Sequence, residues 1–219
     1  MNPAVKKLVA GRTGALAENE VKDLLRTYGI PTTRYQVVRT EKDLETLSLR
    51  FPVALKVCSS KILHKTDVGG VKLNIQDTEE LKKNFKEFRK KFPTENLLVD
   101  QMEEKGVEMI VGLVQDPTFG LSVMVGIGGI FTELYKDVSF RVVPIDTYDA
   151  AQMIEELTGK RLLEGFRGMK ANKQLVIDLV LKVSQLGEQL IDHVDQMDLN
   201  PVFVYEDRVC VVDAKLILK

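Results

Sequence analysis

Hydrophobic residues recur along this chain at two spacings, one typical of amphipathic helices and the other of short strands. One helical pattern is followed by Gly29 and Pro31, which are suited to act as a left-handed cap and a helix breaker. Asp77 precedes another such pattern, and its carboxylate is suited to cap the helix. The spacing predicts helices over 16–28, 41–49, 77–91, a segment after Thr147, and about 173–193.

The strand-like runs lie between these helices, and turn residues separate them. Residues 161–172 carry no periodic pattern and are predicted to be irregular. Strands are predicted over 34–38, 53–57, 71–75, 96–101, 107–115, 121–127, 139–144, 197–205 and 208–212. We find no repeat, low-complexity tract or flexible linker, so the elements are expected to form one compact α+β (α/β) body.

Composition narrows the class of protein. The 219 residues can bury a good core as one domain or two small ones. Lys and Arg number 31 against 32 Asp and Glu, which argues against a nucleic-acid-binding surface. No apolar run approaches the ~20 residues of a membrane span, and the N-terminus lacks a signal-peptide core. Cys58 and Cys210 show no metal-binding spacing, so a reducing, cytoplasmic location is expected.

The segment 51–75 carries the most informative chemistry. Lys56 lies inside an apolar strand, where a buried ammonium needs an anionic partner. His64 follows in a polar loop, and Gly69 and Gly70 let backbone approach a ligand closely. Together these residues indicate phosphate chemistry. Each also has a simpler interpretation: a surface lysine, a solvated or structural histidine, and an ordinary hairpin turn.

A second candidate site lies in the C-terminal hairpin. If Glu206 and Asp207 form its turn, counting outward places Asn200 opposite Asp213. Asp198 is two residues before Asn200 and therefore lies on the same face of the sheet. Two carboxylates and a carboxamide are hard oxygen ligands suited to Mg²⁺ bound together with phosphates. The alternative is that these are solvated polar residues at strand ends.

Three segments, 51–75, 108–145 and 198–204, together resemble the ATP-grasp subunit of ADP-forming acetate–CoA ligases (acyl-CoA synthetases), which are related to the β subunit of succinyl-CoA synthetase. The resemblance covers nearly the whole chain. It implies an ATP-grasp fold of two lobes with ATP or ADP and Mg²⁺ held between their sheets. The smaller lobe would span about 20–100 and the larger about 101–219.

The resemblance assigns nucleotide contacts to particular residues. Lys56 is similar to the strand lysine that contacts the α-phosphate. The family's phosphate flap corresponds to Gly69, Gly70 and Val71. Its adenine-binding hinge corresponds to Gln101 and Met102, and its ribose or flanking carboxylate to Glu108.

The resemblance also implies a metal-binding pair, Asn200 and Asp213. Asp198 replaces the glutamate more usual in the family's E-x-N-P motif, which puts direct coordination in doubt and leaves a water-mediated contact open. Arg141 and Glu133 lie in a family segment where Arg141 suits a phosphate oxygen as a catalytic group. Either residue could instead form a surface ion pair.

His64 resembles the family's second phosphate carrier, which takes phosphate from a phosphohistidine on the partner subunit and delivers it to ADP. A neutral imidazole is nucleophilic near pH 7, and two in-line steps avoid moving the whole acyl site. Lys61 and Lys65 would balance the phosphoryl charge. His193, on the long predicted helix, has no such setting and is expected to be structural.

The family reaction is acyl-CoA + ADP + phosphate ⇌ carboxylic acid + CoA + ATP, and it also requires a CoA-binding domain. No dinucleotide-type glycine motif follows a strand here, so the resemblance implies a subunit of a heteromer, α2β2 in type, whose CoA-binding α subunit carries the first phosphohistidine. Two alternatives stay open: a free-standing ATP-grasp carboxylate ligase, and a non-catalytic nucleotide-sensing subunit.

Overall fold

The computed structural model describes residues 3–62, 64–129, 137–165 and 170–219. The chain packs into two compact units. The larger unit contains the residues up to Gly14, Val21–Thr32 and Lys105–Lys219, and the smaller unit contains Ala15–Glu20 and Thr33–Glu104. Most of the first predicted helix therefore groups with the C-terminal residues. The two lobes drawn from the sequence, about 20–100 and about 101–219, stay a prediction.

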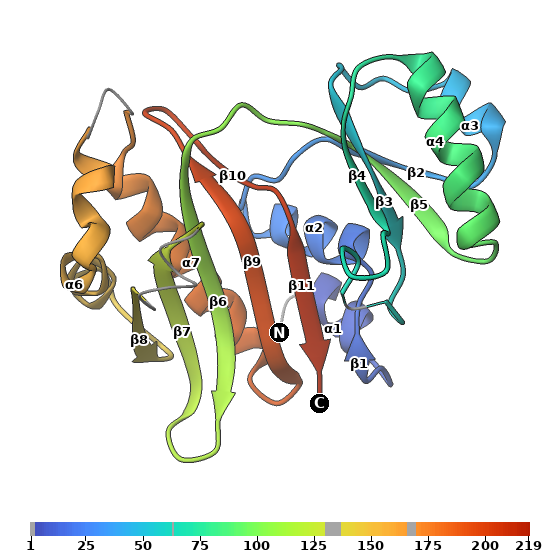
Figure 1. Cartoon of the computed structure of the whole chain (residues 1–219). Coiled ribbons are helices and arrows are strands. Elements are labelled where there is room, and N and C mark those ends of the chain that lie inside the picture. Colours follow the sequence, from blue (N-terminus) through green and yellow to red (C-terminus); the bar gives the residue numbers. More distant parts are fainter. Residues whose placement is uncertain (1–2, 63, 130–136, 166–169) are drawn as a thin grey trace. The chain divides into compact units, whose positions relative to one another are not determined.

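The smaller unit is built on a four-stranded antiparallel sheet in the order β2-β5-β3-β4. Two helices, α3 and α4, accompany it (Figure 1). The strands are β2 (Tyr35–Val38), β3 (Val53–Cys58), β4 (Val71–Ile75) and β5 (Asn96–Gln101), and the helices are α3 (Glu41–Glu45) and α4 (Thr78–Lys91).

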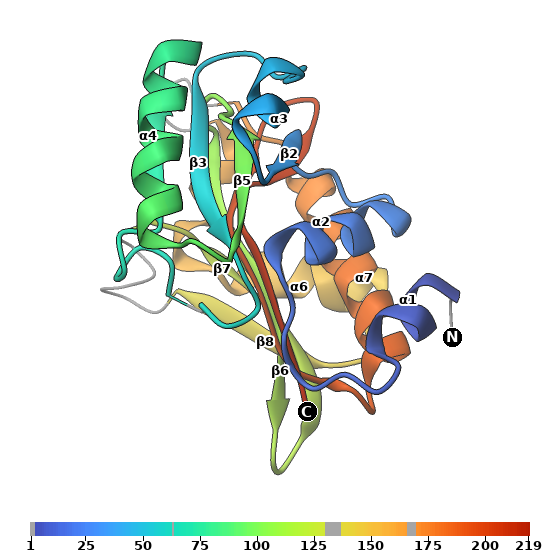
Figure 2. The ribbon, with the colours of Figure 1, turned by 90° about the vertical axis from the view of Figure 1, so that its right-hand side faces the viewer.

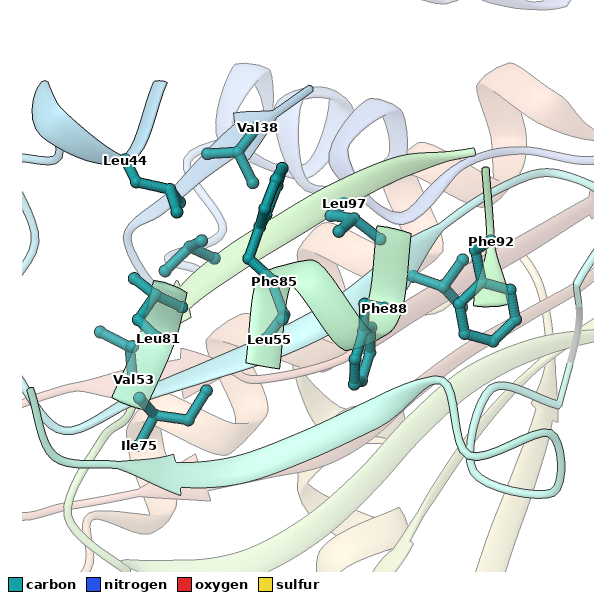
Figure 3. Packing of buried hydrophobic residues seen from close by; sticks show 12 residues of the cluster. Val38, Leu44, Val53, Leu55, Ile75, Leu81, Phe85, Phe88, Phe92 and Leu97 are labelled. Carbon is teal, nitrogen blue, oxygen red and sulfur yellow. The ribbon is translucent and has the colours of Figure 1, made fainter. Parts of the chain in front are cut away.

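Helix α4 supplies much of the core of the smaller unit. Asp77 caps it as predicted, because its carboxylate accepts a hydrogen bond from the Glu80 N–H. Phe85 and Phe88 of α4 lie in one buried cluster with Leu55 of β3 (Figure 3). Burying each such side chain contributes roughly 1.5–3 kcal/mol. Strand β3 is central and all six of its residues are buried, so any charge on it must be compensated inside the unit.

The larger unit is built on a seven-stranded sheet in the order β1-β11-β9-β6-β7-β8, with β10 also paired to β9. The strands are β1 (Gly14–Ala15), β6 (Val107–Asp116), β7 (Gly120–Ile127), β8 (Val138–Val142), β9 (Val194–Val204), β10 (Val209–Val211) and β11 (Ala214–Leu218). The helical elements are α1 (Pro3–Val9), α6 (Thr147–Glu156), the 3₁₀ helix η1 (Thr158–Glu164) and α7 (Lys173–Leu190). Helix α2 (Glu18–Thr27) begins in the smaller unit and belongs to the larger unit from Val21 onward.

Helices α6 and α7 cover one face of this sheet, where α7 contacts β6, β7 and β9 (Figure 2). Gly187 permits a close approach there, since a Cβ at this position would lie 3.0 Å from a methyl group of Leu113. The opposite face, which we call the second face, has a pocket of about 260 Å³. Gly112, Met124 and Asp198 are among the residues that line it.

Most predicted elements are present, and the errors have physical reasons. The region 161–172 is not entirely irregular, because η1 extends to Glu164. The helix predicted over 41–49 ends at Glu45, and the longest helix ends at Leu190. Strand β11 was not predicted, because its five alternating residues are too short a pattern next to the hairpin. In the described ranges no helix is long and apolar enough to cross a membrane.

Candidate nucleotide and metal sites

Lys56 projects from β3 into a buried pair of carboxylates. Its side chain is 6% exposed, and its Nζ lies 2.8 Å from Glu18 Oε1 and 2.7 Å from Asp100 Oδ2. Glu18 begins α2, and Asp100 lies on the neighbouring strand β5. The anionic partner predicted for a buried lysine is therefore present as two carboxylates of the protein. A contact between Lys56 and the nucleotide stays a prediction.

Glu18 uses its second oxygen for another lysine. Its Oε2 lies 2.5 Å from Nζ of Lys65, in the loop between β3 and β4. The carboxylate of Glu18 is only 3% exposed, and the Lys65 side chain is 15% exposed. We call Glu18, Lys56, Lys65 and Asp100 the lysine–carboxylate cluster. Its two ammonium groups and two carboxylates balance in charge, which makes their common burial tolerable.

The loop that carries His64 is closed by the two glycines. Gly70 N–H donates to the Lys65 carbonyl at 2.6 Å, and Gly69 N–H donates to that of Thr66 at 2.9 Å. Gly69 has a φ of +59°, and a Cβ on Gly70 would lie 2.6 Å from Cγ1 of Val57. The turn and its close packing on β3 therefore require glycine. This agrees with the simpler interpretation of the two glycines as residues of a hairpin turn. That they cover the nucleotide phosphates together with Val71, the first residue of β4, stays a prediction.

His64 itself is exposed, and its two basic neighbours lie in different environments. Lys61 and Lys65 were both expected to balance a phosphoryl group on the imidazole. Lys61 is exposed, whereas the ammonium of Lys65 is bound by Glu18. In this structure Lys65 therefore fixes the loop, and Lys61 is the lysine of the two that lies in solvent.

The predicted hinge lies at the end of β5. The N–H of Gln101 donates to the Arg34 carbonyl at 2.8 Å, and the N–H of Met102 donates to that of Pro52 at 3.1 Å. The Gln101 side chain accepts from the N–H of Arg50. Both backbone donors are thus used within the smaller unit. Adenine recognition by these N–H groups would have to replace those bonds.

The C-terminal hairpin has the predicted register. Cys210 pairs with Phe203, Ala214 pairs with Leu199, and the Asn200 N–H donates to the Asp213 carbonyl at 3.2 Å. This places Asn200 opposite Asp213, as counting from the turn predicted.

Asp198 lies on the second face of the sheet, opposite Gly112 of β6 and Lys215 of β11. Its Oδ1 is buried, and no donor within the described part of the chain bonds to it. Burial raises the pKa of Asp198, and the nearby carboxylate of Asp213 raises it further, while Lys215 acts in the opposite direction. A buried carboxylate oxygen without a donor beside a second carboxylate is a place where a cation would be stabilising.

These three residues fit a magnesium ion. Across the described ranges no group of three or more His, Cys, Asp and Glu residues could hold a metal by itself. The candidate set is instead two carboxylates and the amide of Asn200, which is exposed. Three side chains with hard oxygen ligands suit Mg²⁺, because this ion keeps several of its waters and usually binds together with substrate phosphates.

Glu108 lies on β6, where the glycine-rich segment after β7 packs against it. Gly128 N–H donates to the Glu108 carbonyl at 2.7 Å, and a Cβ on Gly129 would lie 3.0 Å from the Glu108 carboxylate. The glycines therefore pack tightly against Glu108, and the positive φ of Gly129 (+70°) also favours glycine at that position.

Arg141 is held by an ion pair. Its guanidinium donates to both carboxylate oxygens of Glu156 on α6, and Ser139 also donates to Glu156. The hydrogen bonds with Glu156 raise the pKa of Arg141, and those from Arg141 and Ser139 lower the pKa of Glu156. The ion-pair alternative left open by the sequence is thus present for Arg141. Glu133 lies outside the described residues.

Residues 7–218 match the family described as ATP-grasp domain. This chain belongs to the ATP-grasp family. Within that family it groups with the ADP-forming acetate–CoA ligases. The acetate–CoA ligase [ADP-forming] I subunit beta of Pyrococcus furiosus is 41% identical over 93% of this chain and 91% of that relative.

Solved structures of such ATP-grasp proteins have the same fold. One is the Ca. Korarchaeum cryptofilum dinucleotide forming acetyl-coenzyme A synthetase 1 in complex with coenzyme A, Ca-AMPCP and HgCl+, with 40% identity, 95% of each chain covered and a TM-score of 0.87. Another structure of that protein contains coenzyme A and Mg-AMPPCP, with the phosphohistidine segment pointing towards the nucleotide binding site. It is 39% identical, covers 98% of this chain and 100% of that one, and has a TM-score of 0.84.

Two residues of this ATP-grasp chain were missed by sequence reasoning. Glu18 and Asp100 lie 38 and 44 positions away from Lys56. The need of Lys56 for an anion was a correct signal, but no local pattern identifies which carboxylates meet it. Only the pairing of β3 with β5 and the position of α2 do so.

The raised pKa of Asp198 leads to a first prediction for this ATP-grasp chain. A raised folded-state pKa means that Asp198 contributes most stability when protonated, and that this contribution is lost as pH rises through the folded-state pKa. At pH 7 its charge therefore costs stability. We expect Asp198→Asn to raise the melting temperature of the metal-free chain by roughly 1–3 °C and yet to weaken Mg-nucleotide binding.

Asp195→Asn is the matched control, because Asp195 is exposed on the same strand. It should change neither the melting temperature nor calorimetric Mg-ADP affinity. If Asp198→Asn lowered the melting temperature, the carboxylate would be stabilising and the interpretation of its environment would be wrong.

Proposed function

We propose that this chain is the nucleotide-binding subunit of an ADP-forming acyl-CoA synthetase. Its reaction is acyl-CoA + ADP + phosphate ⇌ carboxylic acid + CoA + ATP, and it transfers phosphate between a phosphohistidine and ADP. The observation that carries the proposal is His64, exposed on a loop that is anchored beside the buried Lys56. A relative's phosphohistidine segment points towards its nucleotide site, which is consistent with such a transfer.

His64 is the proposed second phosphate carrier. Its neutral imidazole attacks the phosphorus of the partner's phosphohistidine, so that one N–P bond forms as the other breaks. The imidazole of His64 gives up its N–H proton, and the departing imidazole of the partner takes one up. A β-phosphate oxygen of ADP then attacks the phosphorus on His64 and displaces the imidazole, which takes up a proton as ATP forms. An exposed side chain on a loop can reach both partners, whereas a buried one could not.

Other residues of the smaller unit would bind the nucleotide. We propose that Lys56 contacts the α-phosphate, that Gly69, Gly70 and Val71 lie over the phosphates, and that Gln101 and Met102 contact adenine. The lysine is already compensated by Glu18 and Asp100, so its ammonium would share its hydrogen bonds among carboxylates and phosphate.

In the larger unit, Asn200 and Asp213 would hold Mg²⁺, and Asp198 would act directly or through water. The ion, when bound, would neutralise phosphate charge. Glu108 is the proposed carboxylate near the ribose. Arg141 is the proposed catalytic arginine, but its ion pair with Glu156 means that it would have to exchange one carboxylate for a phosphate oxygen.

The partner of the chain is proposed from its relatives. The Pyrococcus furiosus protein is named a beta subunit, which supports a separate CoA-binding α subunit that carries the first phosphohistidine. An α2β2-type heteromer in the cytoplasm is the arrangement that we propose. Co-expression with the neighbouring gene product, followed by ATP-formation assays with several acyl-CoAs, tests it directly. No ATP from any acyl-CoA, with a stable complex in hand, would contradict the proposal.

Asp213→Ala should weaken Mg-ADP binding by at least ~10-fold, as loss of a group around a bound metal commonly does. Asp207→Ala is the control, because Asp207 is exposed at the hairpin turn. Isothermal calorimetry with and without Mg²⁺ measures both. An affinity of Asp213→Ala equal to the wild type would contradict the metal assignment. Failure of the wild-type chain to bind any Mg-nucleotide would contradict its enzymatic role.

A further inference from the structure

We propose that Glu18 is a positioning residue for the phosphate transfer. Through Lys65 it fixes the loop that carries His64 to the strand that carries Lys56. The inference rests on the proposed function but adds a residue that lies outside the segments on which that function was assigned. Glu18 is 46 positions before His64, and only the fold brings it to the loop.

The carboxylate of Glu18 serves two lysines at once. Its Oε1 is 2.8 Å from Lys56 Nζ, and its Oε2 is 2.5 Å from Lys65 Nζ. One oxygen thus holds the rigid central strand and the other holds the loop. Because Lys65 is the next residue after His64, fixing its side chain restricts where the imidazole can be.

Backbone hydrogen bonds restrain the same residue from the other side. The Lys65 carbonyl accepts from Gly70 N–H at 2.6 Å, and the Gly70 carbonyl accepts from Val57 N–H at 2.8 Å. The loop is therefore joined to β3 by its backbone and to Glu18 by a side chain. With two attachments the loop has a defined orientation, which one attachment would not give.

Charge decides what happens when Glu18 is neutralised. Without its negative charge, the two ammonium groups repel each other in a poorly solvated place. Lys56 still has Asp100 at 2.7 Å and cannot leave the sheet. Lys65 lies in a loop with its side chain already 15% exposed, so it would move into solvent. Neutralising Glu18 is therefore expected to displace the loop that carries His64 and to leave strand β3 in place.

The transfer step can be isolated in the full-length chain. The wild type and its variants are phosphorylated on histidine with phosphoramidate, Mg-ADP is added, and ATP formation is followed in a single turnover. As ATP forms, the N–P bond at the histidine breaks, a bond to the ADP oxygen forms, and the imidazole takes up a proton. Of the two histidines in the chain, His193 is accounted for by a His64→Asn baseline.

We expect Glu18→Gln and Lys65→Gln each to slow this transfer by about 10- to 100-fold, the effect of misplacing a reacting group by about an ångström. ADP affinity should fall by less than the rate does, since the proposed contacts of the base stay and only the glycines over the phosphates are loosened. The double variant Glu18→Gln/Lys65→Gln should be no slower than either single variant, because each single change already breaks the same Glu18–Lys65 ion pair. Lys65→Arg should restore most of the rate.

Glu20→Gln is the matched control, because Glu20 lies in the same helix and its carboxylate accepts from the Ala17 N–H. It should transfer at the wild-type rate. Amide exchange of Gly69 and Gly70 is a second measurement that needs no activity, and both Glu18→Gln and Lys65→Gln should accelerate it.

The outcomes separate the two proposals. If the phosphorylated wild type makes no ATP, the proposed function fails, while the exchange of Gly70 still reports whether Glu18 holds the loop. If the wild type transfers and Lys65→Gln does so equally fast, the inference about Glu18 is overturned. Lys65 is partly exposed, so this variant serves even if Glu18→Gln does not fold. Equal losses of rate and ADP affinity would also overturn it, because they would indicate general destabilisation.

Discussion

His64→Asn is expected to abolish acyl-CoA-dependent ATP formation by the complex with the partner subunit, by more than ~1,000-fold. Asparagine cannot carry the phosphoryl group, and no other histidine lies in the loop between β3 and β4. Because His64 is exposed, its loss removes no core packing, and the melting temperature should stay within about 1 °C.

Two measurements make this result specific. Calorimetry should give an unchanged Mg-ADP affinity, since the imidazole is proposed to carry phosphate and not to hold the nucleotide. His193→Asn should leave turnover intact. Full activity of the His64→Asn complex would remove the carrier role and favour a free-standing ATP-grasp ligase that makes an acyl phosphate directly.

Lys56→Met is expected to destabilise the protein by about 3–5 kcal/mol, the cost of breaking a buried ion pair by removing one partner. Methionine fills the volume among the strands but leaves Glu18 and Asp100 buried next to each other without the ammonium between them. Urea denaturation at pH 7 measures the free energy of unfolding. Lys72→Met is the control, because Lys72 is exposed on β4, the next strand.

The expected loss changes how Lys56 must be studied. A Lys56→Met chain that fails to bind ADP could simply be unfolded, so binding should be compared with Lys56→Arg, which keeps the charge. Adding Asp100→Asn to Lys56→Met should recover part of the stability, because it removes one of the carboxylates left behind. If Lys56→Met unfolded with the wild-type free energy, the cluster would contribute nothing to the fold.

Local sequence patterns predicted the C-terminal hairpin well. Its register follows from a two-residue turn and from the alternation of side chains along a strand, which are both short-range rules. The strand β3 was predicted with the same ease, because Val53 to Cys58 form one apolar run interrupted only by Lys56. In such cases the residues that decide the structure are close together in the chain.

The lysine–carboxylate cluster could not be predicted in that way. The sequence indicates that Lys56 needs an anion, and both the neighbouring residues and the ATP-grasp resemblance suggested that this anion is a phosphate. The fold supplies Glu18 from a helix start and Asp100 from a neighbouring strand. Arg141 is a similar case, since it lies on β8 and its partner Glu156 lies on α6, which packs against that strand. Long-range ion pairs depend on tertiary structure, and local spacing carries no information about them.

The shortness of the turn at Glu206 and Asp207 has an evolutionary consequence. Strand β9 is held in place by its pairing with β6. A deletion in this turn would therefore shift the strands that follow it, β10 and β11, along β9. A slip of one residue would rotate Asp213 to the helix-covered side and leave Asn200 facing a different residue. Homologues that keep the proposed metal site are therefore expected to vary the identity of these two turn residues, while a shortened hairpin should accompany loss of Asn200 or Asp213.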